Sequence, residues 1–158
     1  MRTKVGKLFQ NIKTRKVSAY EYIEKNKYCA FVDMMQKKGN TQCIVTFDIM
    51  LKFMEHFLYK HNAKITAINF MGEDESLQKE IIALLNKMDK QPFFWNSLKL
   101  ELLLLNKDNH VKIQSVDFKC SEDGFLLSLL ATGLFTVTDS SYSKVADELS
   151  GLMETFIK

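Results

Sequence analysis

Apolar residues recur every three or four positions over much of the chain, and they alternate with polar residues in other stretches. The first spacing predicts amphipathic helices, because a helix turns about 100° per residue, whereas alternation predicts strands. Helices are expected over residues 5–12, 18–38, 47–61, 73–88 and 142–157, the fourth with an acidic first turn. The helix at residue 18 is favoured by a capping box, in which Ser18 and Glu21 satisfy free backbone donors.

Strands are expected over residues 64–71, 98–104, 111–118 and 125–137, the last either continuous or broken at Gly133. Asp123-Gly124 predicts a hairpin turn before the last of these, although a helix from Ser121 is the competing interpretation. Residues 106–109 have turn chemistry. Residues 42–47 fit either a short strand or the entry to the next helix.

This order of elements predicts the α+β class. We expect N-terminal helices, a strand and a crossover helix, then an antiparallel three-strand meander and a C-terminal helix packed on one sheet face. At 158 residues the chain fits one domain. We divide it into a basic amphipathic N-terminal segment, residues 1–17, and a single α+β domain, residues 18–158.

Charge is distributed unevenly along this sequence. Residues 1–17 hold six basic residues and no acid, whereas the remainder holds 16 basic and 19 acidic residues. A basic amphipathic helix can bind an anionic membrane or an acidic protein face, and it can also be a docked structural helix with a solvated basic face. The candidate partner- or membrane-binding residues are Arg2, Lys4, Lys7, Leu8, Phe9, Lys13, Arg15 and Lys16.

A second candidate is the aromatic run Phe93, Phe94 and Trp95, which follows the only proline. Large aromatic side chains are costly to leave in water, so this run either closes the end of the core or forms a binding hot spot.

Histidine and cysteine give no sign of a metal or catalytic site. His56 and His61 are five residues apart, about 140° around a helix, whereas helical metal pairs normally use a spacing of four. We therefore predict surface or capping histidines, no metal and no cofactor. Cys29 and Cys43 are expected in the core, and Cys120 is expected to be the most exposed thiol. Three unpaired cysteines favour a reducing compartment, taken as the cytoplasm.

No nucleotide-binding or hydrolase motif is present, so we favour binding over catalysis. The leading expectation is a non-enzymatic protein-binding module, such as an adaptor, an inhibitor or an immunity-type protein, acting on a partner or on a second copy of itself. One alternative is a protein attached to an anionic membrane through residues 2–16. Another is a small-molecule-binding domain or enzyme with a pocket between helices and sheet. Nucleic acid fits less well, because no basic strand carries interleaved aromatics.

Overall fold

The computed structural model describes residues 2–23, 27–72, 75–90 and 95–158. The helices are α1 (Tyr28–Lys37), α2 (Phe47–Lys60), α3 (Glu75–Lys90), α4 (Trp95–Asn109) and α5 (Tyr142–Phe156). The strands are β1 (Thr3–Asn11), β2 (Val17–Glu21), β3 (Asn40–Gln42), β4 (Lys64–Phe70), β5 (Ile113–Cys120), β6 (Phe125–Leu130) and β7 (Leu134–Thr138). None of the helices in these ranges is long and apolar enough to cross a lipid bilayer.

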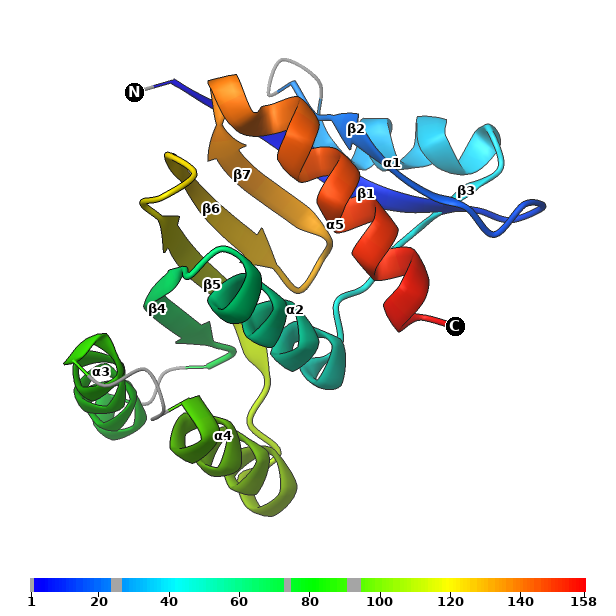
Figure 1. Cartoon of the computed structure of the whole chain (residues 1–158). Helices are drawn as coiled ribbons and strands as arrows, with labels where there is room; N and C mark the ends of the chain where they lie inside the picture. The colour runs from blue at the N-terminus through cyan, green and yellow to red at the C-terminus, as the bar shows by residue number, and fades with distance from the viewer. Residues whose placement is uncertain (1, 24–26, 73–74, 91–94) are drawn as a thin grey trace.

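The strands form one antiparallel sheet in the order β2-β1-β7-β6-β5-β4, with β3 added beside β1 (Figure 1). The predicted α+β class and the antiparallel meander are thus confirmed. The meander consists of β5, β6 and β7. Its first strand, β5, is the one predicted over residues 111–118, which was expected to be the second strand of the meander.

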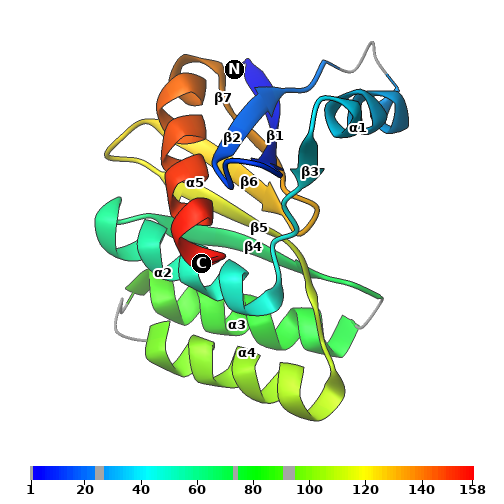
Figure 2. The same ribbon diagram turned by 90° about the vertical axis from the view of Figure 1, so that its right-hand side faces the viewer.

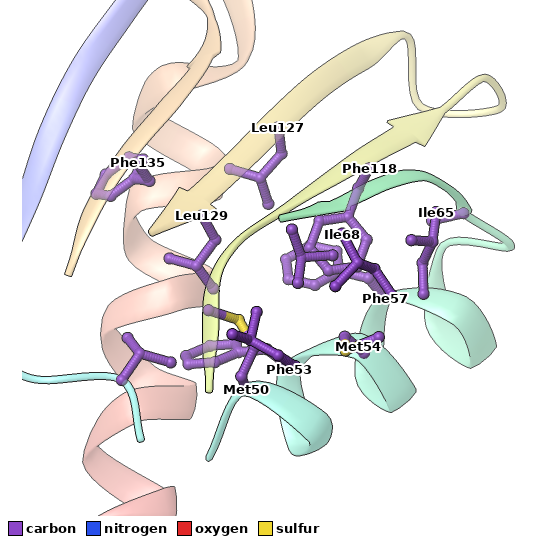
Figure 3. Packing of buried hydrophobic residues seen from close by; sticks show 14 of the residues in the cluster. Met50, Phe53, Met54, Phe57, Ile65, Ile68, Phe118, Leu127, Leu129 and Phe135 are labelled. Carbon is purple, nitrogen blue, oxygen red and sulfur yellow. The ribbon is translucent and has the colours of Figure 1, made fainter. Parts of the chain in front are cut away.

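Helices α2 and α5 cover one face of this sheet, α5 above β1 and β2 and α2 above β4 and β5 (Figures 1 and 2). Figure 3 shows side chains of α2 pointing at those of the sheet, with Phe57 beside Phe118 and Ile68. Helix α1 covers the other face at the β1 end, where Phe31 packs on Phe9. Helices α3 and α4 lie side by side beyond the β4 edge (Figure 2).

The helix predicted over residues 5–12 is wrong, because residues 3–11 form strand β1. The helix predicted over residues 18–38 is wrong in its first half, since residues 17–21 form strand β2, which pairs with β1. The spacing that suggested a helical face also places Leu8 and Phe9 on opposite faces of a strand, each buried by a different layer. Asn11 ends β1 by accepting hydrogen bonds from the backbone of Lys13 and Thr14. Asn is favoured in turns of this kind because its side chain bonds to the backbone. Ser18 and Glu21 come after this turn and lie in β2, so they form no capping box.

The strand predicted over residues 98–104 is also wrong, since these residues belong to α4, as do residues 106–109 of the predicted turn. Leu98, Leu102 and Leu105 recur at i, i+4 and i+7 and pack into the core, which is a helical spacing. The alternation of leucine with Lys99 and Glu101 is therefore a local coincidence within a run of good helix formers.

Other predictions are confirmed. Asp123-Gly124 lies in the β5–β6 turn, where Gly124 has a φ of 74° and its N–H bonds to the Cys120 carbonyl, which rules out a helix from Ser121. The last predicted strand breaks at Gly133 into β6 and β7. Helices α2, α3 and α5 and strand β4 lie where their spacing predicts, and Thr46 caps α2 by accepting from the N–H of Ile49.

Candidate functional site

Strand β1 divides the predicted N-terminal binding surface. Lys7, Leu8 and Phe9 are buried, with exposed fractions of 0%, 0% and 1%, so they are not available to a membrane or a partner. The remaining basic residues lie at the two ends of β1, which are roughly 30 Å apart at 3.3 Å per residue. At one end Lys4 pairs with Asp139 at 3.4 Å. The eight candidate residues therefore do not make one surface.

The other end of β1 keeps a cationic character. Lys13, Arg15 and Lys16 are exposed in the β1–β2 turn, and exposed Lys37 and Lys38 close α1 beside them. The backbone N–H of Ile12 bonds to the Gly39 carbonyl at 3.0 Å, which holds the two segments together. We call these five residues the basic tip. Lys37 and Lys38 were not among the predicted site residues, because they are distant in sequence.

Only one member of the predicted aromatic hot spot can be placed. Phe93 and Phe94 lie outside the described residues. Trp95 is 1% exposed, and its indole N–H donates to Glu55 Oε1 at 3.3 Å. Lys99 also approaches this carboxylate, at 3.5 Å. Trp95 therefore closes the core at the start of α4, the structural one of its two predicted roles.

Helix α4 carries apolar residues on two sides. Leu98, Leu102 and Leu105 face the core. Leu100, Leu103 and Leu104, which we call the leucine stripe, are exposed by 59%, 39% and 45%. At about 100° per residue the two sets are centred on nearly opposite sides of the helix. Since a helix that is apolar all round is normally buried, the stripe has the character of a contact surface.

A groove of about 620 Å³ runs between α2, β4, α3 and the start of α4. Its lining is mixed, with Ile65, Leu85 and Trp95 beside polar Asn62 and Asn86. The groove lies between helices and sheet, where the small-molecule alternative expects a pocket, and its volume is in the range of small-molecule sites.

Four polar side chains meet where α2, α5 and the β5–β6 turn converge. Glu148 lies between two imidazoles, with His56 Nε2 at 2.6 Å and His61 Nε2 at 2.7 Å from its Oε2. The second His61 nitrogen, Nδ1, lies 2.5 Å from Asp123 Oδ2. Because ionised carboxylates only accept hydrogen bonds, these nitrogens are the donors. The prediction of a capping role holds for His61, which ends α2, but the ring is buried and not on the surface.

Each charge in this cluster depends on the others. Burial opposes protonation of His61, but the carboxylates of Asp123 and Glu148 outweigh it and raise the pKa of the His61 ring. Burial likewise favours a neutral Glu148, yet hydrogen bonds from His56 and His61 lower the pKa of its carboxyl. The cluster is therefore an ionised network between two helices, and its members come from three distant segments of the chain.

The cysteines differ from prediction in two of three cases. Cys29 is exposed and Cys120 is fully buried, the reverse of what their neighbours suggested, while Cys43 is buried as expected. Burial, with Asp123 and Glu148 nearby, raises the pKa of the Cys120 thiol to about 12. Burial raises the pKa of the Cys43 thiol to about 11. Neither buried thiol is a ready nucleophile at neutral pH.

Lys7 is a fully buried cation on the α1 side of the sheet. Its ammonium donates to the Thr132 carbonyl and lies 5.4 Å from the centre of the Tyr28 ring. Burial lowers the pKa of Lys7 from 10.5 to about 8, against a small opposing effect of Cys43. At neutral pH the chain therefore holds a charge in a place that favours the neutral amine.

We expect Lys7→Met to raise the free energy of unfolding by about 1–2 kcal/mol at pH 7, because methionine fills similar space without a buried charge. Below pH 8 the ammonium is charged in both states and destabilises the fold in full. Above pH 8 the folded protein loses this proton before the unfolded chain does, so the parent gains stability. Urea unfolding should show a smaller difference in the free energy of unfolding between Lys7→Met and the parent at pH 9 than at pH 7. A larger difference at pH 9 would refute this interpretation.

Comparisons with protein-family models, with curated proteins and with solved structures give no match to this chain.

Proposed function

We propose that the chain is a protein-binding module that docks a partner on the leucine stripe of α4. The observation that supports this most directly is the exposure of Leu100, Leu103 and Leu104 on the side of α4 opposite its core-facing leucines. Burying a leucine side chain contributes about 1.5–3 kcal/mol, so three together can supply the apolar centre of an interface.

The shape of the stripe suits an amphipathic helix of the partner. Its three leucines lie at i, i+3 and i+4, the spacing that a second helix meets when it packs alongside. Lys99 lies on one side of the stripe and Glu101 on the other. Two copies of α4 packed antiparallel would place each of these charges against its own equivalent. These charges disfavour antiparallel self-association, and we propose a different protein as the partner.

The free thiols fit a reducing compartment, and on that ground we propose that the protein acts in the cytoplasm. All three cysteines are unbridged, and one of them, Cys29, is exposed to solvent. An exposed free thiol is readily oxidised outside such compartments.

Replacing Leu100, Leu103 and Leu104 with glutamine tests the proposal, since glutamine retains helix propensity. In pull-downs from native extract, a protein captured by the parent should be lost from this variant. The matched control replaces Ile44, Met71 and Leu126 with glutamine. These residues are exposed by 54%, 52% and 43% elsewhere on the surface, and this variant should still capture the protein. Unchanged urea unfolding of both variants shows that the fold is intact.

The basic tip supports a second candidate, attachment to an anionic surface. It places five cations in two adjacent turns, and without them the chain carries a net charge of −2, since the whole carries +3. Replacing Lys13, Arg15, Lys16, Lys37 and Lys38 with glutamine in the same assay separates the candidates. If the captured protein, or binding to anionic vesicles, is lost from this variant and kept by the stripe variant, the tip and not the stripe is the contact surface.

A further inference from the structure

We propose that His56, His61 and Glu148 form a binding site for a divalent transition-metal cation, with zinc as the cation that the donor set fits best. The ligand atoms of these three residues all lie within 4.8 Å of one another. Two imidazole nitrogens and one carboxylate oxygen are a donor set typical of zinc, whereas calcium and magnesium prefer oxygen alone.

The sequence spacing argued against this site, and the packing of α5 explains the difference. His56 and His61 are too far apart around α2 to share a metal as a helical pair. Glu148 of α5 lies between the two rings and brings their Nε2 atoms to a common point. The third ligand thus comes from a neighbouring helix, almost ninety positions later in the chain.

Asp123 has the place of a positioning residue in this site. Its carboxylate accepts a hydrogen bond from the Nδ1–H of His61, with 2.5 Å between Nδ1 and Oδ2. This leaves Nε2 as the nitrogen directed at the shared point. Metal-binding histidines usually have such a carboxylate or carbonyl on the other ring nitrogen, because it fixes the tautomer and the ring orientation. An ion pair between His61 and Glu148 alone would not need this fourth group.

Solvent reaches the cluster on its His56 side. The His56 and Glu148 side chains are 20% and 16% exposed, and a shallow groove lined by His56, Tyr59 and Phe156 opens beside them. Ligand atoms around a tetrahedral zinc are about 3.4 Å apart. The present contacts of 2.6 and 2.7 Å must therefore lengthen by rotation of the side chains, and the imidazoles release their Nε2 protons to solvent.

Isothermal titration of the tag-free Cys29→Ser protein with Zn²⁺ and with Co²⁺ tests the proposal, since this background removes the exposed thiol as a competing ligand. We expect one ion per chain and cobalt d–d absorption bands of a four-coordinate nitrogen–oxygen site. Mg²⁺ should not bind. His56→Gln should weaken zinc binding by at least about 100-fold, and Asp123→Asn by about 10–100-fold. His110→Asn changes the third histidine, which is exposed between α4 and β5, and it should leave the zinc affinity unchanged.

Circular dichroism checks the fold of each variant before titration, so a loss of binding is not mistaken for unfolding. Titration without a 1:1 event in the parent, or equal affinities of His56→Gln and His110→Asn, would overturn the proposal. The cluster would then be a hydrogen-bonded network alone.

Discussion

Gly133→Ala should lower the free energy of unfolding by about 3 kcal/mol or more, because two penalties combine at this turn. Gly133 joins β6 to β7 with a φ of 86°, a conformation that strains any residue with a Cβ. A Cβ there would also lie 2.4 Å from the backbone carbonyl oxygen of Cys43. A backbone atom cannot rotate away as a side chain can, so strands and connecting segment must shift together.

Gly151→Ala is the matched control for that experiment. Gly151 lies in α5, and nothing lies within 4 Å of the place that a Cβ would take, so alanine should stabilise this helix by up to about 1 kcal/mol. Urea unfolding of both variants measures the difference. Equal stabilities would contradict the close packing of the β6–β7 turn against Cys43.

Leu8→Ala and Phe9→Ala should each destabilise the protein by about 2–5 kcal/mol, the range for large side chains removed from a core. Leu8 belongs to the core beneath α2 and α5, and Phe9 packs with Phe31 and Met35 on the opposite face. Ile12→Ala, 60% exposed at the end of β1, should change stability little. Losses below about 0.5 kcal/mol at both buried positions would favour a detached N-terminal segment over a central strand.

The spacing of apolar residues predicted correctly those elements that are buried on one side only. Helices α2 and α5 each present one apolar side to the sheet, so their period appears directly in the sequence. Strand β1 is different, because it is covered on both faces and its buried run Gly6–Phe9 has no alternation. Gly6 allows the Phe135 ring to approach, with a Cβ position only 2.4 Å from Phe135 Cζ, which no local pattern reveals.

Helix α4 defeats the same reasoning for another reason. Its core-facing leucines and its leucine stripe lie on both sides of the helix, and with Lys99 and Glu101 between them they alternate locally and obscure the helical period. A leucine-rich run of fifteen residues with neither glycine nor proline was nevertheless long for a strand, and that length was the available signal for a helix.

The histidine–carboxylate cluster could not be found from spacing alone. Its residues come from α2, the β5–β6 turn and α5, and only the tertiary packing brings them together. The basic tip was predicted in part, since Lys13, Arg15 and Lys16 belong to the acid-free basic segment at the start of the sequence. Their neighbours Lys37 and Lys38 join them through the pairing of β1 with β3.

The affinity of a purified partner, once captured, tests the central claim most directly. Calorimetry should give a dissociation constant at least about 100-fold weaker for the Leu100, Leu103 and Leu104 glutamine variant than for the parent, since each hot-spot leucine contributes about 1 kcal/mol or more. The Ile44, Met71 and Leu126 variant should bind as the parent does. Equal dissociation constants for the parent and the stripe variant would show that α4 is not the binding surface.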